Sequence, residues 1–504
     1  MNRAKALATS VSARALAAWG AAVLAGGAVI VLALTVGRPI WLVYGLLAVL
    51  VLSGLMILAA RAGTAGWLAG AVLLAAGALP DRIHRLWEPL ALGRAFNIVV
   101  VSVLVCGALV WLGRMLVQGS PKPAGLALPQ AVVLIIGLAG LAIHAGDYAD
   151  LDPVWRGMVC MFLPMLGFWV VATSRLEERH ALMLVRLLLA VGAAMAILGL
   201  RWPLQMWRNP SASALFGTAG GWGFRTMTPV GGPGPSALAL GMMLPISLAM
   251  ALLDKRSLRP VWALCALGML AGVAMSVNRS GIIACSAAVL LFAWLNRGFL
   301  RRRLAVMAAV LVVAVVMVTG LVLAYRHYTP FARLVRLVDL DSPSDRLRWY
   351  SARTALAIGS ARLLFGSGIG RFYPRDGSMA PMIVDGGSSA RDPHCLYLLG
   401  LAEMGIPGLL AVLWLVIKPL ADLLRARRSA SAQHATLLAG FSAAALAMMS
   451  YSVTSCALFV HLRVAIVAWW TLGLGYQFRD RPAALPAHSP YRPAVSARTT
   501  RKPR

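Results

Sequence analysis

The chain has 504 residues, of which 60% are hydrophobic and 13% are charged, and its mean hydropathy is +0.78. Soluble domains cannot bury so much hydrocarbon, and disordered chains are poor in apolar residues, so both classes are excluded. The formal net charge of +30 would suit a nucleic-acid-binding protein. However, the basic residues are spread over short connections between apolar runs. That placement is typical of a membrane protein, with lipid and not nucleic acid around it.

A membrane-spanning helix needs about 20 predominantly apolar residues. Fourteen runs approach this length, although two are short, so the sequence predicts an all-α, polytopic fold with 12–14 transmembrane helices. The first run lacks a small-residue cleavage site after a short core, so we expect it to be a retained helix. The runs lie near 14–36, 40–60, 64–79, 95–117, 127–145, 155–173, 182–200, 235–253, 260–277, 281–296, 304–325, 395–418, 434–456 and 459–477.

Basic residues predict the orientation, because cytoplasmic loops carry an excess of lysine and arginine. With the N-terminus in the cytoplasm, all five lysines fall on the cytoplasmic side, together with the basic connections 255–259, 297–303 and 418–428. The outer side then carries arginine and no lysine. Arginine binds phosphate through a planar fork, although a high-GC codon bias would also favour it over lysine.

Only one connection between the runs is long, an outer loop at 326–394 that contains ten arginines. A shorter outer segment, 201–234, is rich in glycine, proline and tryptophan, and the tail is rich in proline and arginine. We therefore expect a cytoplasmic N-terminus (1–13), N-terminal transmembrane helices (14–200), central transmembrane helices with a rim motif (201–325), a long periplasmic loop with short helices (326–394), C-terminal transmembrane helices (395–478) and a disordered cytoplasmic tail (479–504).

Charged residues at the rim of a membrane are costly, so they are candidates for function. The first is Arg279, in the sequence Val277-Asn278-Arg279-Ser280-Gly281 between two apolar runs at the outer surface. The alternative is a tight turn whose arginine reaches the lipid headgroups.

The second candidate is an arginine-rich helix that Ser344 or Asp345 would open and Gly359 would end. Arg346 and Arg353 share one face with Tyr350, whereas Arg348 lies on the far side from Arg353. Not all of these arginines can therefore point at one ligand. The alternative is an amphipathic helix that lies on the bilayer. Its expected apolar stripe consists of Trp349, Ala352, Ala355 and Leu356.

A glycine-rich turn and a histidine complete the set of candidates. Backbone N–H groups of the turn Gly366-Ser-Gly368-Ile-Gly370 could cradle phosphate, but the motif is weak alone. His394 stands where the long loop returns to the membrane, and could either hold a proton or form a local cap. Glu403, deeper in that span, should be protonated or paired with Arg279 or Arg463.

Metal and nucleophilic chemistry are not indicated. The six cysteines form no CxxC pair, and no outer DxD or HxxE cluster stands near the arginines. Asp147, Asp150 and Asp152 lie on a different connection, and the neighbourhood of Ser280 offers no base. We therefore expect no metal and no cofactor.

The order of these motifs resembles the bacterial O-antigen ligase and O-antigen polymerase family, part of the C-type membrane glycosyltransferase superfamily. The resemblance covers roughly 220–425, and the N-terminal half matches only by hydropathy. It is carried by Arg225, Asn278-Arg279-Ser280-Gly281, the stretch 348–356, Gly366-Ser-Gly368-Ile-Gly370, His394, and Glu403-Met-Gly405-Ile-Pro-Gly408.

This resemblance implies a metal-independent enzyme of the bacterial inner membrane, with both termini in the cytoplasm. Such enzymes take a glycan from an undecaprenyl diphosphate carrier at the periplasmic face. A ligase passes the glycan to lipid A–core, and a polymerase passes it to another carrier-linked glycan. O-antigen ligation is the function we expect, with O-antigen or exopolysaccharide polymerisation as the alternative.

The residues carried over from the family have defined roles. Arg279 and Arg348 would be catalytic by clamping the diphosphate, and His394 by activating the acceptor hydroxyl. The expected substrate-binding residues are Arg225, Arg346, Arg353, Gly366, Gly368 and Glu403.

The chain departs from the family pattern in the rim motif, in the segment 228–236 and at Cys395, where the family has asparagine. These departures weaken an assignment of the acceptor. A lipid-linked glycan transporter and a non-catalytic scaffold are the alternatives from other classes. A transporter would be expected to carry charges along a central path, whereas here they concentrate in one outer loop.

Overall fold

The computed structural model describes residues 127–144, 152–173, 176–208, 226, 228, 230–300, 343–370, 372 and 393–479. Five of the predicted spans lie outside these residues: 14–36, 40–60, 64–79, 95–117 and 304–325. The predicted tail after residue 479 also lies outside them. The other nine predicted spans each correspond to a helix of the structure.

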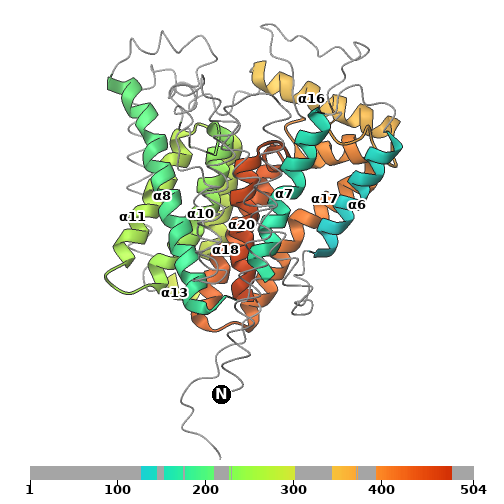
Figure 1. The fold of residues 1–504 in the computed structure, drawn as a ribbon. Coiled ribbons are helices and arrows are strands. Elements are labelled where there is room, and N and C mark those ends of the chain that lie inside the picture. The colour runs from blue at the N-terminus through green and yellow to red at the C-terminus, as the bar shows by residue number, and fades with distance from the viewer. Residues whose placement is uncertain are drawn as a thin grey trace, which may run out of the picture.

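All regular elements among the described residues are helices (Figure 1), apart from one isolated bridge between Thr228 and Gly231. This confirms the predicted all-α, polytopic class. The helices are α6 (Ala127–Ile143), α7 (Asp152–Thr173), α8 (Glu178–Arg208), α10 (Pro233–Leu253), α11 (Arg259–Met275), α12 (Arg279–Leu295), α13 (Arg297–Leu300), α16 (Pro343–Ala361), α17 (Leu396–Ser429), α18 (Ala432–Ser452), α19 (Ala457–Val460) and α20 (Leu462–Arg479).

Four of the described helices are long and apolar enough to cross a membrane: α8, α10, α17 and α18. The apolar helices α6, α11 and α12 are shorter. α17 is not straight, because Gly405 has non-helical backbone angles inside it. Its first arm runs beside α16 and its second arm descends through the bundle (Figure 1).

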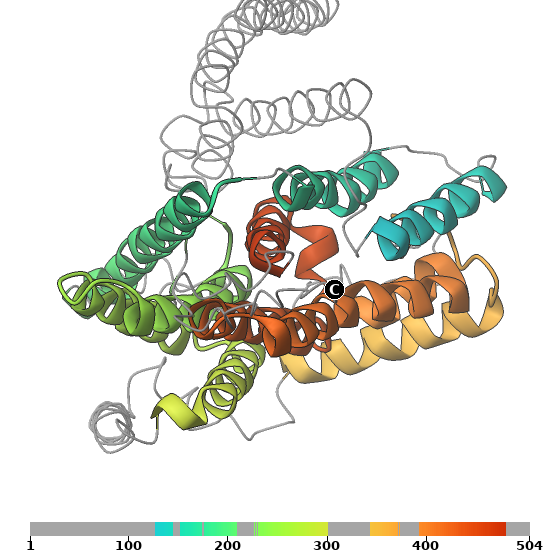
Figure 2. The same ribbon diagram turned by 90° about the horizontal axis from the view of Figure 1, so that it is seen from below.

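The core is built around α20, which lies in the middle of the bundle (Figure 2). Every residue of α20 from Val464 to Phe478 is buried. A helix that is apolar on all sides belongs in the centre of a bundle, so composition and position agree. The ring of Trp469 meets that of Phe168 on α7 edge to face, and the ring of Phe478 stacks on that of Phe441 on α18.

Small residues allow the other central helices to approach closely. A Cβ built on Gly281 of α12 would lie 2.3 Å from Cβ of Ala237 on α10. Helices in a membrane gain little hydrophobic energy from meeting, so close packing through small side chains is a main source of their association. The glycine of the rim motif therefore holds the start of α12 against α10.

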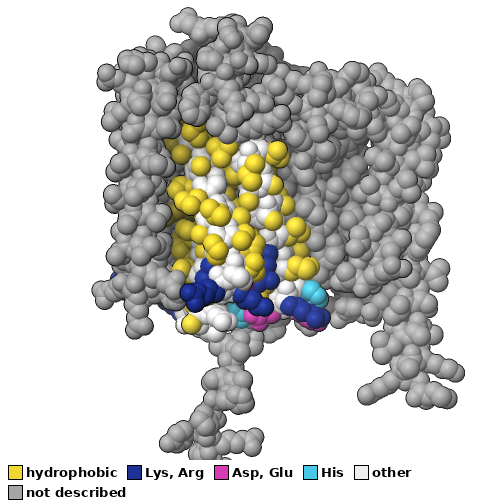
Figure 3. All heavy atoms as spheres, turned by 90° about the vertical axis from the view of Figure 1, so that its left-hand side faces the viewer, with side chains coloured by type: hydrophobic (Ala, Val, Ile, Leu, Met, Phe, Trp, Pro, Cys, Tyr) yellow, Lys and Arg dark blue, Asp and Glu magenta, His cyan; other side chains and the backbone are white. Residues whose placement is uncertain are grey.

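Charged connections gather at one end of the bundle. Figure 3 shows hydrophobic side chains over one face, with lysine and arginine side chains collected along its lower edge. The predicted cytoplasmic connections meet there: Arg427 at the end of α17 donates a hydrogen bond to the carbonyl of Leu295 at the end of α12. The start of α18 reaches α8, where His434 contacts Glu178.

Asp254 joins three segments at this charged end. Its carboxylate accepts hydrogen bonds from Arg186 at 2.9 and 3.1 Å, from the indole of Trp262 at 2.9 Å and from the backbone N–H of Lys255 at 2.8 Å. Burial raises the pKa of Asp254, but the hydrogen bonds from Lys255, Trp262 and Arg186 outweigh burial, so the pKa lies below its usual range. The loop after α10 is thereby fixed to α8.

Candidate functional site

The rim motif starts α12 with a strained residue. Val277 has φ of 49°, a left-handed conformation that is a genuine outlier for a β-branched side chain. Asn278 follows as the N-cap, and its side chain accepts the backbone N–H of Gly281 at 2.7 Å. Arg279 is therefore the first residue of α12, where the helix dipole is positive and a cation is unfavourable. A bound anion would relieve this conflict.

The start of α10 lies beside the rim motif and is held by a small hydrogen-bond network. Ser236 Oγ accepts the backbone N–H of Thr228 at 2.8 Å and donates to the carbonyl of Gly231 at 3.0 Å. The backbone N–H of Thr226 donates to Met275 at 3.0 Å, which ties this segment to the end of α11. The segment 228–236, where the sequence departs from the family pattern, therefore folds as a compact cap on α10.

The last turn of α18 joins the starts of three helices. A Cβ built on Gly234, at the start of α10, would lie 2.5 Å from Oη of Tyr451 and 3.3 Å from Nδ2 of Asn278. At the same turn, Tyr397 near the start of α17 donates to the carbonyl of Met449 at 3.0 Å. The N-termini of α10, α12 and α17 therefore lie at one end of the bundle, opposite the charged connections.

Sequence reasoning did not single out Tyr451. Its side chain is buried, and its hydroxyl reaches the start of α10 beside Asn278. The signal in the sequence is weak, because a tyrosine near a helix end is common at a membrane interface. Only the packing of α18 against α10 and α12 places this hydroxyl at the rim.

His394 is the second non-glycine residue with a left-handed backbone, with φ of 50°. It is partly buried and stands two residues before the first residue of α17. The N-cap of α17, Cys395, makes no side-chain cap hydrogen bond. His394 and the start of α17 therefore lie at the same end of the bundle as Arg279.

α16 brings Arg348 to the same end of the bundle as the N-termini of α10, α12 and α17, and packs against α17 through small residues. Between Arg348 and Ala361 the buried residues of α16 are Ser351, Ala355 and Gly359, and a Cβ built on Gly359 would lie 2.5 Å from Cγ of Leu401 in α17. Of the predicted apolar stripe, Ala355 is buried, whereas Trp349 and Leu356 are 65% and 50% exposed.

The small residues of this helix thus pack against α17, while the large residues of the apolar stripe face outward. The expected helix end at Gly359 was early by two residues, since α16 continues to Ala361. Arg348 is partly buried and Arg353 is exposed, so these two arginines lie in different surroundings. The side chain of Arg346 and the whole of Arg225 lie outside the described residues.

The glycine-rich turn after α16 interlocks with the bend of α17. Backbone N–H groups of Ser367 and Gly368 donate to the carbonyls of Ala402 and Glu403 at 2.8 and 2.9 Å. A Cβ on Gly366, which has φ of 61°, would lie 2.4 Å from the carbonyl carbon of Glu403. The glycines are needed here for contact between two backbones, so the N–H group of Gly368 is already engaged by protein.

Glu403 stands at this junction and holds the turn with its side chain. Oε1 accepts the backbone N–H of Gly370 at 3.0 Å and that of Phe372 at 3.4 Å. The expected ion pair with Arg279 or Arg463 is therefore replaced by two backbone donors. Glu403 stands two residues before the bend at Gly405, so it does not lie part-way down a straight span.

Two helices of the N-terminal half support the same turn. A Cβ on Gly137 in α6 would lie 2.5 Å from Cδ1 of Ile369, and a Cβ on Gly157 in α7 would lie 2.9 Å from its Cγ2. Ile369 therefore fills a space that two glycines leave open. His144 Nε2 donates to the carbonyl of Gly366 at 3.1 Å. No local pattern in the sequence signals this support, because Gly137, His144 and Gly157 lie far from the turn in the chain.

The arrangement combines features that suit an anionic, membrane-embedded substrate. Three helix N-termini, an arginine on the first residue of α12 and an arginine on α16 lie at one end of the bundle. Within the described residues, no group of three or more His, Cys, Asp and Glu side chains is placed to hold a metal ion.

Part of the chain is similar to a known protein family. Residues 237–413 match the family model described as O-antigen ligase. The match runs from the start of α10 through the rim motif, α16, the glycine turn, His394 and the bend of α17. It confirms the resemblance that the motifs predicted over this part of the chain. A search of curated proteins gives no match.

Proposed function

We propose, from the match of residues 237–413 to the O-antigen ligase family, that the chain is a membrane glycosyltransferase. It would transfer a glycan from an undecaprenyl diphosphate carrier to an acceptor at the periplasmic face of the bacterial inner membrane. The acceptor we favour is lipid A–core. Transfer to another carrier-linked glycan, as in O-antigen or exopolysaccharide polymerisation, is the alternative. The end of the bundle that carries Lys255 and Lys418 would face the cytoplasm.

One observation carries the proposal. Val277 and His394 both have left-handed backbones, and both border the starts of helices at the same end of the bundle. Such strain costs about 1–3 kcal/mol per residue and tends to be retained where function requires it. Val277 stands two residues before Arg279, and His394 is the candidate base itself. The two residues with unfavourable backbone angles thus lie at, or close to, residues that the proposed chemistry requires.

Cleavage of the sugar–phosphate bond leaves a diphosphate with increasing negative charge. Fixed cations can stabilise this charge without a metal ion, and arginine does so through paired N–H donors. In this mechanism Arg279 and Arg348 hold the diphosphate, with Arg225 and Arg346 as supporting cations and Arg353 as a further contact to the donor. The N-terminus of α12 adds a partial positive charge beside Arg279.

His394 would be the general base. It would take the proton of the acceptor hydroxyl as that oxygen attacks the anomeric carbon, while the bond from that carbon to the diphosphate oxygen breaks. Electrons then remain on the carrier diphosphate, which leaves as the anion held by the arginines. The left-handed backbone of His394 fixes the side chain next to the start of α17.

The glycine turn and Glu403 would act by positioning the catalytic residues. Gly366 and Gly368 contact the backbone of α17, and Glu403 binds the turn, so all three hold α16 against α17. We infer that this contact sets the distance between Arg348 on α16 and His394 before α17. Glycan transfer would then depend on these residues although the substrate does not touch them.

The test is complementation of a deletion strain, read on a lipopolysaccharide gel. A ligase deletion should leave bare lipid A–core while carrier-linked polymer accumulates, and the wild-type gene should restore the ladder. His394→Ala and Arg348→Ala should not restore it, whereas Arg256→Ala, an exposed arginine at the opposite end, should. Core carrying a single repeat in the deletion strain would assign polymerisation. A normal ladder without the gene would overturn both O-antigen assignments, and secreted polysaccharide would then be the glycan to measure.

A further inference from the structure

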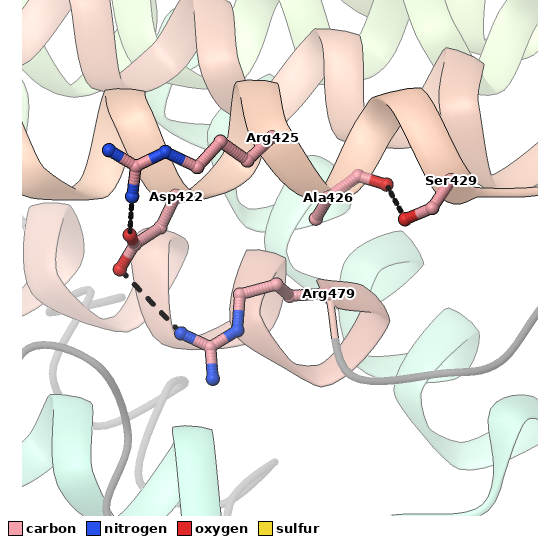
Figure 4. A pocket seen from close by; sticks show the side chains of 5 residues that line it. All are labelled: Asp422, Arg425, Ala426, Ser429 and Arg479. Carbon is pink, nitrogen blue, oxygen red and sulfur yellow. Dashed lines mark hydrogen bonds and ion pairs between the residues drawn. The ribbon is translucent and has the colours of Figure 1, made fainter.

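A second cationic site lies at the end of the bundle opposite the proposed active site. An open cavity of about 340 Å³ is lined by Asp422, Arg425, Ala426, Ser429 and Arg479, from the last turns of α17 and from the end of α20 (Figure 4). None of these residues belongs to the glycosyl-transfer chemistry. The cavity also lies outside residues 237–413, which match the family.

The carboxylate in this cavity is already satisfied by close partners. Asp422 is only 8% exposed, and each of its oxygens lies 2.9 Å from Nζ of Lys418. The hydroxyl of Tyr476 donates to it as well, at 2.9 Å. Lys418 therefore neutralises the charge of Asp422, and Tyr476 supplies a further hydrogen bond.

The two arginines stand further from the carboxylate. Arg425 and Arg479 approach Asp422 at 3.4 and 3.6 Å, longer than the roughly 2.7–2.9 Å of strong charged hydrogen bonds. They come from different helices and border the cavity on two sides (Figure 4). Among the described residues, three cations, including Lys418, stand around this one carboxylate. The guanidinium of Arg479 is held 4.5 Å from the ring centre of Tyr476.

The cavity continues an apolar stripe that faces outward from α17. Leu410, Trp414 and Ile417 are 59%, 40% and 46% exposed. Arg425 follows Trp414 by eleven residues, which is about three helical turns, so both lie on the same face. Arg425 is itself 74% exposed. A lipid with its chains along this stripe would bring its headgroup to the arginines.

We propose that Arg425 and Arg479 bind the phosphate group of an anionic membrane lipid in this cavity. The two guanidinium groups supply planar, charged donors to phosphate oxygens from two sides. The buried Asp422, held by Lys418 and Tyr476, keeps α17 and α20 together so that the arginines stay a fixed distance apart. The site is independent of the proposed glycosyl transfer.

The experiment uses the purified full chain in detergent micelles and follows the melting temperature during titration with dioleoyl phosphatidylglycerol. Dioleoylglycerol, which has the same chains and no phosphate, and inorganic phosphate are titrated in parallel. The lipid that binds the folded chain should raise its melting temperature in a concentration-dependent way. The double variant Arg425→Gln with Arg479→Gln should need about tenfold more phosphatidylglycerol or worse. The double lysine variant, which keeps charge without the fork, should fall between them.

Arg256→Gln is the matched control, because Arg256 is an exposed arginine at the same end of the bundle. Its titration should equal that of the wild type. An equal response of the double glutamine variant, or an equal response to dioleoylglycerol, would overturn the proposal. A full response to inorganic phosphate with none to the lipid would overturn the lipid source. Should the double variant unfold, Arg425→Gln alone carries the same test.

Discussion

Oε1 of Glu403 accepts the backbone N–H of Gly370 at 3.0 Å, although the two residues are 33 positions apart in the chain. This bond joins the turn after α16 to the bend of α17. Because α16 carries Arg348 and α17 begins just after His394, the bond connects the supports of two proposed catalytic residues. Its loss should therefore affect both stability and transfer.

Glu403→Ala leaves the N–H groups of Gly370 and Phe372 without their acceptor. We expect a loss of about 1–3 kcal/mol in the free energy of unfolding, because an unsatisfied buried donor costs roughly that much. Glu403→Gln keeps an acceptor oxygen and should lose less than half as much. Melting temperatures in detergent check the ranking. Equal losses in the two variants would show that the charge of Glu403, and not its acceptor oxygen, holds the turn.

Gly405→Ala should be more damaging than its small size suggests. Gly405 has φ of 70°, and its added Cβ would lie 2.4 Å from the carbonyl oxygen of Leu363. The turn would have to separate from α17, and the variant should lose both stability and glycan transfer. Gly268→Ala is the control, since a Cβ there meets nothing within 4 Å. That variant should be neutral or slightly stabilised, because alanine favours a helix interior.

The lowered pKa of Asp254 predicts that the stability of the folded chain depends on pH. Its pKa in the folded chain is below the ordinary value of 3.8. The stabilisation is therefore fully present above the ordinary pKa and is lost as the pH falls through the lower folded value. Between about pH 6 and about pH 3, the melting temperature of the wild type should fall more steeply than that of Asp254→Asn. Parallel curves for the two proteins would contradict this assignment.

Substitutions at His394 can distinguish the chemical role of its side chain from the effect of its left-handed backbone. Asparagine tolerates a left-handed backbone better than most residues, whereas alanine does not benefit from it. His394→Asn should therefore melt near the wild type, and His394→Ala should melt below it. Neither side chain can act as a general base, so transfer should fall by about 10²–10⁴-fold in both. Transfer that survives in His394→Asn would assign His394 a purely structural role.

The sequence was sufficient for the features that depend on local pattern. The nine apolar runs that fall within the described residues each match a helix, because a run of apolar residues long enough to span a membrane is a local signal. The sequence was insufficient where a partner decides the outcome. The buried face of α16 is chosen by α17, so Ser351 and Gly359 are inside while Trp349 is outside. The role of Glu403 likewise depends on a turn whose position no local pattern predicts.

Arg279 offers the sharpest test of the proposed diphosphate clamp. It is the first residue of α12, where the helix dipole disfavours a cation, so Arg279→Ala should remain folded while transfer is lost. Arg279→Lys keeps the charge and loses the paired donors, so transfer should recover only in part. The pairing of a folded chain with lost transfer separates a substrate contact from a structural one. If Arg279→Ala instead unfolds the protein, the arginine stabilises the fold and the clamp must be assigned elsewhere.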